Sequence, residues 1–308
     1  METIFDLAII GGGPAGVAAG VYSARKKIKA ILITENFRGQ SAVSGEIQNW
    51  IGDISISGEE LHKRFEKHLK HYSKDIEIKE KETVTNITKS ENIFTIKTTK
   101  GEYKSKTVLI TTGSVRKKIQ VKGAEEFEGK GITYCATCDA PMFTDMDVVV
   151  IGGGNSAFEA TSQLLAYAKS ITIIQRSEFR AEPIMMEKIL SNPKVKAITN
   201  IDLLEIKGDK FVSAIVYKDK KTGETVEYPT SGIFVEIGTN PSVDFIEHGL
   251  VKLNETEQII IDPKTQKTST LGIWSAGDCT DGLYAQNNIA VGDAVKAIED
   301  IYRSLKSK

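Results

Sequence analysis

The sequence predicts an α/β protein made of two Rossmann-like domains, each a doubly wound, three-layer arrangement around a parallel sheet. An apolar run, a glycine-rich turn and a helical pattern follow one another twice, 141 residues apart. The chain has 308 residues, which is enough for two domains of about 150 residues each. Both copies of the repeat have the order strand, helix, strand, so both predict parallel sheets.

The first copy starts near the N-terminus. We expect a buried strand over residues 6–10, a helix ending near Ala24 and a second strand over residues 30–34. The second copy predicts a strand over residues 148–151, a helix to about Ala168 and a strand over residues 171–174. A strand followed by a glycine-rich turn and a helix is the context in which such a turn binds a dinucleotide.

The first glycine-rich turn reads Gly11-Gly-Gly13-Pro14-Ala15-Gly16. Glycines at these spacings permit a tight turn, a close approach of the backbone to a pyrophosphate and close packing of helix on strand. The amino end of the helix favours the negative charge of that pyrophosphate. Glu35 lies at the end of the second strand, where an acid can accept hydrogen bonds from a ribose.

The second turn reads Gly152-Gly-Gly154-Asn155-Ser156-Ala157. The strand after it has no acid at the ribose position, and Arg176 and Arg180 follow instead. Arginine there favours a 2′-phosphate, so this copy is expected to bind NADPH, with NADH as the alternative. Two dinucleotide sites in one chain predict a flavin plus a nicotinamide, and therefore a flavoprotein.

Strand-like segments and a final helix complete the predicted order of elements. We expect hinges in the polar stretches 114–121 and 239–245, which would insert the second nucleotide domain into the first. We therefore expect an FAD-binding domain over 1–115 and 246–308, and an NAD(P)H-binding domain over 116–245. The further expected elements are strands near 84–86, 93–98, 107–111, 211–218, 232–237 and 258–262, and a helix over 290–305.

Two of the three cysteines, Cys135 and Cys138, have the spacing C-x-x-C just before the second repeat. A zinc site needs about four ligands, and no histidine has ligand spacing with this pair, so no metal is expected. A redox dithiol needs only the two sulfurs and a nearby proton donor, which Asp139 can be. The odd cysteine, Cys279, is expected to be buried and without a catalytic role.

Charge and hydropathy exclude several classes of partner. Lys plus Arg is 40 and Asp plus Glu is 41, a net charge of −1 that suggests neither nucleic acid nor an anionic membrane. No apolar stretch reaches the roughly 18 residues of a membrane span. With the odd cysteine count, we expect a cytoplasmic protein. His62, His68 and His71 are expected on a solvated helix face, and Trp50 and Trp274 in a core or beside a flavin.

Taken together, these residues resemble the low-molecular-weight thioredoxin reductase family, the bacterial and archaeal type of FAD-dependent pyridine nucleotide-disulfide oxidoreductase. The resemblance covers essentially the whole chain, and the order of its motifs is more specific than any one of them. The matching segments are Gly11 to Gly16, Gly39-Gln40, Asn49-Trp50, Thr112-Gly113, Cys135 to Asp139, Gly152 to Ala157, Arg176 with Arg180-Ala181, Gly238-x-x-Pro241, and Ala276 to Cys279 followed by Gln286.

The resemblance implies how the cofactors and electrons are handled. Cys138 would face the flavin, Cys135 would attack a thioredoxin-like protein disulfide, and Asp139 would donate a proton. The inserted domain would rotate between two arrangements, and the protein would be a homodimer. The resemblance places FAD on the first glycine-rich turn with Gly39, Gln40, Asn49, Thr112, Gly113, Asp278 and Gln286, and NADPH on the second turn with Arg176 and Arg180.

Two departures from the family pattern keep alternatives open. The basic cluster reads Gln175-Arg176-Ser177 where the family has His-Arg-Arg, which removes one 2′-phosphate contact, and Ala285 stands where a basic residue commonly precedes the glutamine. NADH, or reduced ferredoxin as in flavin thioredoxin reductases, could then be the donor. The flavoprotein of alkyl hydroperoxide reductase is also similar, but it carries an extra N-terminal dithiol domain. The non-enzyme alternative is a flavin-binding redox sensor.

Overall fold

The computed structural model describes residues 3–44 and 47–306. The chain divides into two compact units, and one of them is discontinuous. The first unit comprises Met1–Ser44, Trp50–Val115 and Asn240–Lys308, and the second comprises Arg116–Thr239 with the short segment Gly45–Asn49. The expected limits of the functional domains, 1–115 with 246–308 and 116–245, stay a prediction. The second compact unit ends at Thr239, and the first unit resumes at Asn240.

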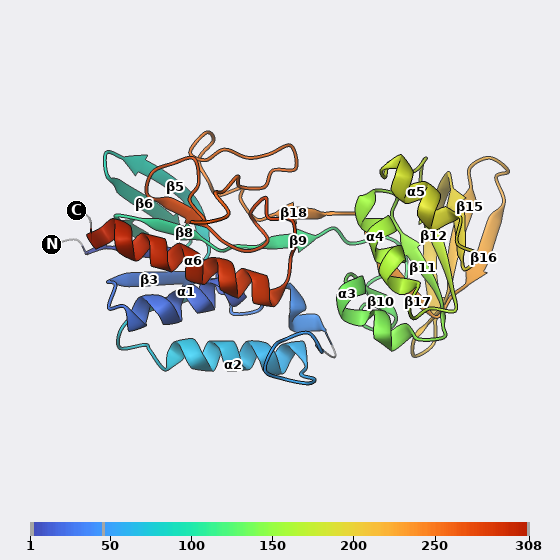
Figure 1. The fold of residues 1–308 in the computed structure, drawn as a ribbon, viewed down its shortest axis with the longest axis horizontal. Helices are drawn as coiled ribbons and strands as arrows, with labels where there is room; N and C mark the ends of the chain where they lie inside the picture. Colours follow the sequence, from blue (N-terminus) through green and yellow to red (C-terminus); the bar gives the residue numbers. More distant parts are fainter. Residues whose placement is uncertain (1–2, 45–46, 307–308) are drawn as a thin grey trace. The chain divides into compact units, whose positions relative to one another are not determined.

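The first unit is built on a five-stranded parallel sheet with the order β19-β8-β2-β3-β4 (Figure 1). A four-stranded sheet with the order β1-β7-β6-β5 forms a second layer. The strands of the parallel sheet are β2 (Leu7–Ile10), β3 (Ala30–Thr34), β4 (Glu77–Glu80), β8 (Val108–Ile110) and β19 (Ile273–Ser275). Those of the second sheet are β1 (Ile4–Phe5), β5 (Val84–Ser90), β6 (Ile93–Thr98) and β7 (Glu102–Ser105).

Helices cover the remaining face of that parallel sheet. They are α1 (Pro14–Arg25), α2 (Gly58–Lys70) and α6 (Asn287–Lys306), and a short 3₁₀ helix, η1 (Gln40–Val43), precedes α2. Alternate residues of β2 face opposite layers: Leu7 and Ile9 pack with the helices, whereas Ala8 and Ile10 pack with the four-stranded sheet. This two-residue period is what a strand covered on both faces requires.

The second unit repeats this plan with a parallel sheet of order β10-β17-β11-β12-β13 and an antiparallel sheet β14-β15-β16. Val148 and Val150 pack on helix α4, and Val149 and Ile151 pack toward the antiparallel sheet. The strands are β10 (Ile132–Thr133), β11 (Asp147–Ile151), β12 (Ser170–Gln175), β13 (Val195–Thr199), β14 (Ile201–Gly208), β15 (Val212–Asp219), β16 (Thr225–Pro229) and β17 (Gly232–Val235). The helices are α3 (Ala136–Asp139), η2 (Ala140–Phe143), α4 (Asn155–Leu164) and α5 (Pro183–Leu190).

Both βαβ repeats and the α/β class are confirmed. Each unit has three layers as expected, but the layer opposite the helices is an antiparallel or mixed sheet instead of more helices. The two connections between the units contain β9 (Ser114–Arg116) and β18 (Thr239–Pro241), which pair with each other. The stretches expected to be hinges therefore begin as paired strands.

Two local predictions were wrong. Residues 258–262 form no strand: Ile259 makes isolated bridges to Leu253 and Thr280, and it alone is buried among the three successive isoleucines 259–261, so the run offers no continuous face to pair. Helix α4 ends at Leu164, four residues before its expected end, in a turn closed by the Tyr167 amide on the Leu164 carbonyl. The closing helix, expected over 290–305, is present as α6.

Candidate functional site

The first glycine-rich loop forms an open cradle at the amino end of α1. Gly11 has a φ of +112°, and a Cβ added to Gly16 would lie 1.9 Å from the Gly11 carbonyl oxygen, so both positions need glycine. A Cβ added to Gly13 would meet no heavy atom within 4 Å. No side chain caps the helix, which begins with Pro14 and the buried Ala15. The open space around Gly13 and the uncapped amino end of α1 can accommodate the pyrophosphate of a dinucleotide.

A second group of predicted cofactor residues meets beside this loop in the same unit. Gln40, the first residue of η1, donates from Nε2 to Ser114 Oγ at 3.0 Å and to Asp278 Oδ2 at 3.1 Å. Thr112 donates to the Ser242 carbonyl at 2.6 Å, and Gly113 has a φ of +65°. The structure therefore brings together polar groups from four chain segments. Ser114 could not be predicted from the sequence, because its partner Gln40 lies 74 residues away.

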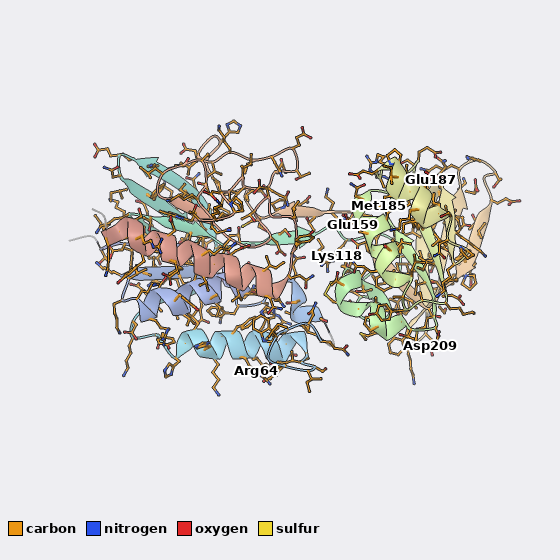
Figure 2. All side chains as sticks on the ribbon, viewed as in Figure 1. Arg64, Lys118, Glu159, Met185, Glu187 and Asp209 are labelled. Atoms are coloured by element: carbon orange, nitrogen blue, oxygen red, sulfur yellow. A yellow bond between two sulfur atoms is a disulfide. The ribbon has the colours of Figure 1, made fainter. Side chains whose placement is uncertain are left out.

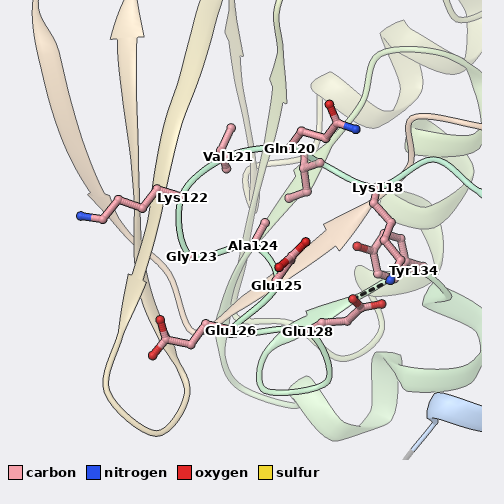
Figure 3. Close-up of a pocket in the computed structure, with 11 residues that line it drawn as sticks. Lys118, Gln120, Val121, Lys122, Gly123, Ala124, Glu125, Glu126, Glu128 and Tyr134 are labelled. Atoms are coloured by element: carbon pink, nitrogen blue, oxygen red, sulfur yellow. Dashed lines mark hydrogen bonds and ion pairs between the residues drawn. The ribbon is translucent and has the colours of Figure 1, made fainter.

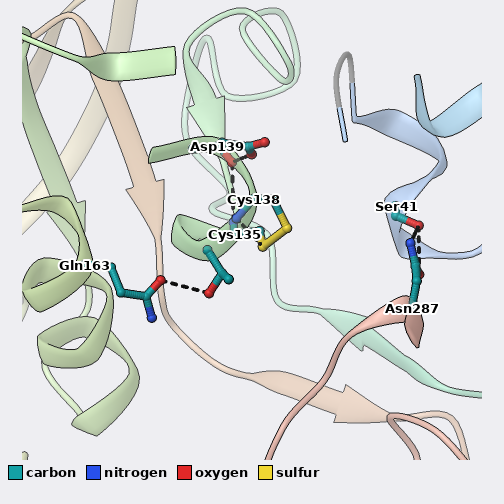
Figure 4. The surroundings of a disulfide bond; sticks show 8 residues. Ser41, Cys135, Cys138, Asp139, Gln163 and Asn287 are labelled. Atoms are coloured by element: carbon teal, nitrogen blue, oxygen red, sulfur yellow. Dashed lines mark hydrogen bonds between the residues drawn. A yellow bond between two sulfur atoms is a disulfide. The ribbon is translucent and has the colours of Figure 1, made fainter. Parts of the chain in front are cut away.

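His62 contradicts the prediction of a solvated helix face, because only 4% of its surface is exposed. Its Nδ1 lies 3.0 Å from the Phe37 carbonyl oxygen and its Nε2 lies 3.1 Å from Ser41 Oγ. Ser41 is in turn hydrogen-bonded to Asn287 at the start of α6, with 3.1 Å between Oγ and Nδ2 (Figure 4). Burial lowers the pKa of His62. The ring therefore fixes both ends of the segment that carries Gly39 and Gln40, whereas His68 is exposed as expected.

Three further residues are predicted to bind the flavin. Glu35 is exposed immediately after β3, and its carbonyl oxygen accepts a hydrogen bond from the Lys81 amide. Gln286 directly precedes α6 and its carbonyl accepts from the Ala290 amide. Asn49 lies in the short segment that belongs to the other compact unit. Their roles stay predictions.

The second glycine-rich loop has the same construction at the amino end of α4. Gly152 has a φ of +150°, and a Cβ added there would lie 2.2 Å from the Glu236 carbonyl oxygen. Gly154 is open, and no side chain caps the helix. Asn155 and Ser156 form its exposed first turn, and Ala157 is buried against the sheet. This geometry again fits a pyrophosphate.

The predicted basic segment docks on this second loop. The Arg180 amide donates to the Gly153 carbonyl at 2.7 Å, and Asn155 Oδ1 accepts from the Glu182 amide at 2.9 Å. The Gln175 side chain packs against Gly153, where an added Cβ would lie 2.7 Å from Gln175 Cγ. The chain after β12 is therefore held beside the loop by bonds at two points. Arg176 and Arg180 are both exposed there, available to a ligand.

Lys220 is a third cation in this region that the sequence did not reveal. Its Nζ donates to the Arg176 carbonyl at 2.9 Å and lies 3.1 Å from Asp202 Oδ1. Lys220 follows β15, 44 residues beyond Arg176, so no motif spacing relates the two. The tertiary structure thus places a lysine, paired with Asp202, close to the strand end where this chain lacks a basic residue of the family pattern.

Glu236 occupies the carboxyl end of β17, beside the second glycine-rich loop. Its backbone amide donates to the Ile151 carbonyl at 2.8 Å. Burial raises the pKa of Glu236 to about 7, opposed by the positive charge of Arg116 and reinforced by Glu159, which projects from α4 (Figure 2). Ligands of such sheets bind outside the carboxyl ends of the strands, where the strand order reverses. Glu236 stands at that point, between β17 and β11.

Cys135 and Cys138 form a disulfide at the start of α3 (Figure 4). Their Cα atoms are 5.3 Å apart. Cys135 is the N-cap of the helix, and its Sγ accepts a hydrogen bond from the Cys138 amide at 3.2 Å. An amide aimed at this sulfur and the amino end of a helix both stabilise a thiolate. The third cysteine, Cys279, is buried and free, as expected.

Asp139 lies at the end of the same short helix and is mostly buried. Its Oδ2 accepts a hydrogen bond from the Thr133 hydroxyl. Burial raises the pKa of Asp139, while the Thr133 hydrogen bond and the charge of Arg116 oppose that rise. The preceding Tyr134 is also half-buried, and burial raises its pKa to about 12. Burial thus favours the protonated form of Asp139, which follows Cys138 directly, as the role of a proton donor requires.

A pocket of about 620 Å³ lies in the second unit between the 118–128 segment and Tyr134 (Figure 3). An ion pair between Lys118 and Glu128, 2.7 Å apart, crosses one side of it. None of the predicted site residues lines this pocket. Over residues 3–44 and 47–306 there is no group of three or more His, Cys, Asp or Glu placed to hold a metal ion. In the same described ranges, no helix is long and apolar enough to cross a membrane.

Residues 5–294 match the family model of the pyridine nucleotide-disulphide oxidoreductases. The chain belongs to this family. A thioredoxin reductase of Peptoclostridium acidaminophilum is 39% identical over 306 residues, which cover 92% of this chain and 96% of that protein. The chain belongs with it in the low-molecular-weight thioredoxin reductases, as the motifs predicted.

Two further comparisons agree with this assignment. The crystal structure of thioredoxin reductase from Streptococcus pyogenes superposes with a TM-score of 0.92 at 31% identity and covers all of both chains. An NADH dehydrogenase of Bacillus subtilis is 37% identical over 95% of this chain, which spans 57% of that protein's length. Family membership implies a flavoenzyme with FAD, a pyridine nucleotide and a redox-active disulfide. The two glycine-rich loops leave room for a dinucleotide each, and Cys135 and Cys138 form the disulfide.

Proposed function

We propose that this chain is an NADPH-dependent reductase that transfers electrons through FAD and the Cys135–Cys138 disulfide to a thioredoxin-like protein disulfide. The observation that carries the proposal is the disulfide at the helix start, with the half-buried Asp139 directly after Cys138 and hydrogen-bonded to Thr133. When bound, FAD would supply the redox chemistry that links hydride transfer from the pyridine nucleotide to two-electron reduction of the disulfide. The redox-sensing module is disfavoured, because the chain matches thioredoxin reductases over its full length.

The chain's own residues carry out the thiol chemistry. Two electrons break the Cys135–Cys138 bond and leave two thiolates, and Asp139 gives its proton to one of them. The other thiolate, on Cys135, attacks a sulfur of the partner's disulfide, forms a mixed disulfide and releases one partner thiolate. Cys138 then returns its proton to the Asp139 carboxylate, and its thiolate attacks Cys135 Sγ, which restores the disulfide and releases the second partner thiolate. The amide of Cys138 and the helix start stabilise the attacking Cys135 sulfur.

NADPH is proposed on the second glycine-rich loop. The pyrophosphate would lie on Gly152–Ala157 at the start of α4, and the 2′-phosphate near Arg176 and Arg180. Support comes from the docking of the basic segment on the loop, through the 2.7 Å bond from the Arg180 amide to the Gly153 carbonyl. Lys220, close to Arg176, adds a positive charge on the same side.

NADH is the second candidate donor, and Gln175 and Ser177 favour it, because they stand where the family has basic residues. The name of the Bacillus subtilis relative, an NADH dehydrogenase, supports the same alternative. Reduced ferredoxin is the third candidate, on the same weakened basic cluster. We also propose a homodimer in the cytoplasm, by resemblance to the family.

The deciding experiment is an anaerobic titration of the purified flavoprotein with NADPH and separately with NADH, followed by bleaching of the flavin absorbance. Thioredoxin is then added and reoxidation is recorded. Fast bleaching by NADPH followed by reoxidation supports the proposal. Bleaching by NADH alone reassigns the donor. If neither nucleotide bleaches the flavin, the nucleotide proposal is wrong, and reduced ferredoxin is tested as the donor.

A further inference from the structure

Thr133 makes two hydrogen bonds that connect the redox disulfide to the neighbouring acid. Its hydroxyl donates to Asp139 Oδ2, and the same Oγ1 accepts from the Cys135 backbone amide, with 3.3 Å between Cys135 N and Oγ1. Thr133 ends β10, whereas Asp139 ends the helix that follows it. One hydroxyl therefore links the strand, the first cysteine and the acid.

The surroundings make this hydroxyl important for the charge of Asp139. Thr133 is 8% exposed, so water competes little for its hydrogen bonds. Burial of the acid favours its neutral form, and two groups favour the charged form: the Thr133 hydroxyl and the guanidinium of Arg116. The strand β17, which pairs with β10, brings Glu236 toward the same guanidinium. The charge of Arg116 thus acts on two acids, whereas the Thr133 hydroxyl donates its proton to Asp139.

We propose that Thr133 is a positioning residue that fixes the Asp139 carboxyl beside the disulfide and sets the pH at which this acid gives up its proton. This inference rests on the proposed role of Asp139 as proton donor. With the hydroxyl in place, the charged form of Asp139 is stabilised, and the acid transfers its proton readily to a newly formed thiolate. Without the hydroxyl, the acid holds its proton to higher pH and is free to rotate.

The test compares Thr133→Val, which removes the hydroxyl at nearly constant shape, with Thr133→Ser, which keeps it. The pKa of the Asp139 carboxyl is measured by carbon-13 NMR in the oxidised holoprotein, and the rate of disulfide reduction is measured against pH. Thr133→Val should raise the Asp139 pKa by about one to two units, as loss of a hydrogen bond to a charged group requires. The high-pH limb of the rate profile should move by the same amount. Thr133→Ser should stay within half a unit of the parent on both readouts.

A second comparison separates this inference from the proposed function. In an Asp139→Asn background, Thr133→Val should no longer shift the rate profile. If Asp139→Asn leaves the rate unchanged, the role of Asp139 as proton donor is wrong, and the NMR titration still decides whether Thr133 controls its pKa. An unchanged Asp139 pKa in Thr133→Val overturns the inference. Should Thr133→Val yield no folded flavoprotein, Thr133→Ala removes the same hydroxyl without adding a methyl group against the acid, and the same criterion applies.

Discussion

The side-chain amide of Gln40 donates a hydrogen bond to the carboxylate of Asp278, with 3.1 Å between Nε2 and Oδ2. The two residues are 238 positions apart in the chain. Gln40 begins η1, and Asp278 follows β19, the edge strand of the parallel sheet. The same amide also bonds Ser114, in the connecting strand β9. The sheet edge therefore positions the loop that we expect to hold the flavin.

Replacing Asp278 with Ala should weaken FAD binding about 10- to 100-fold, because a hydrogen bond to a charged group contributes roughly 1.5–3 kcal/mol. The variant frees Gln40 as well as removing the carboxylate. The dissociation constant of FAD from the apoprotein, measured by flavin fluorescence, checks this. Asp209→Ala, an exposed acid in the other unit, is the control and should change nothing. Equal FAD affinity in both variants would contradict the assigned role of Asp278.

The variant Cys138→Ser should lose essentially all disulfide reductase activity and keep flavin reduction by the nucleotide. The remaining Cys135 cannot close the internal disulfide, so no electrons leave by that route. Stopped-flow bleaching of the flavin and reduction of a thioredoxin-like substrate measure the two steps separately. Cys279→Ala, at the buried free cysteine, is the matched control and should retain both. Substrate reduction that survives in Cys138→Ser would refute the disulfide as the electron carrier.

Arg176→Ala and Arg180→Ala should each raise KM for NADPH about 10- to 100-fold and leave KM for NADH within about threefold. A charge-assisted contact to the 2′-phosphate is worth roughly 1.5–3 kcal/mol, and NADH lacks that phosphate. Lys220→Ala should have a smaller effect of the same sign, since Lys220 bonds a carbonyl and Asp202. The exposed Lys210 gives the control Lys210→Ala. Equal losses for both nucleotides would show that these arginines do not recognise the phosphate.

Binding of the nucleotide should weaken as pH rises through about 7, where Glu236 loses its proton. A charged Glu236 beside the second glycine-rich loop repels the pyrophosphate, and a few-fold to about tenfold loss follows from Coulomb's law at an effective dielectric constant near 20. Glu236→Gln should remove this pH dependence. The dissociation constant of NADPH from pH 6 to 8.5 is the measurement. Glu187→Gln, on α5, is the control (Figure 2); a pH dependence that persists in Glu236→Gln assigns it to another group.

Stability should fall as pH drops below about 6.5, and His62 should account for part of the loss. Burial lowers the pKa of His62 from its ordinary value of 6.5, so the unfolded chain binds this proton more readily than the folded one. The stabilisation is therefore present above pH 6.5 and is lost as pH falls through the window below it. His62→Gln should cost about 1–3 kcal/mol at pH 7.5, because a buried partner is left unsatisfied.

Urea unfolding at pH 5.5 and 7.5 measures this effect. In His62→Gln, the difference in unfolding free energy between the two pH values should be smaller than in the parent protein. The exposed His68 supplies the control His68→Gln, which should keep the parent's pH dependence. If His62→Gln and His68→Gln behave alike, the buried ring is not the titrating group.

Features that depend on neighbouring residues could be read from the sequence. Gly11 and Gly152 adopt positive φ values because the turn from strand to helix requires them, and this requirement is local. The C-x-x-C spacing likewise predicted a redox pair, since one helical turn brings together two cysteines that have two residues between them. The continuous apolar runs of β2 and β11 predicted strands, and the structure buries both faces of each.

Features that depend on partners distant in the chain could not be predicted from the sequence. His62 was expected in solvent because its helix is highly charged, yet Phe37 and Ser41 enclose its ring. Lys220 approaches Arg176 only because β15 ends near the end of β12. Residues 258–262 have the apolar content of a strand but find no neighbour that pairs along their length. In each case the surroundings in the folded chain, and not the local sequence pattern, decide the outcome.

The sequence by itself determined the two βαβ repeats, both glycine-rich loops, the redox cysteines and the family, because short-range stereochemistry and spacing encode them. Only the tertiary structure decided which groups surround these motifs: Asp278 and Ser114 on Gln40, Thr133 on Asp139, and Lys220 beside Arg176. Burial and hydrogen bonding depend on which atoms surround a group in the folded chain. Their effect on a carboxyl such as Asp139 therefore appears only when the chain has folded.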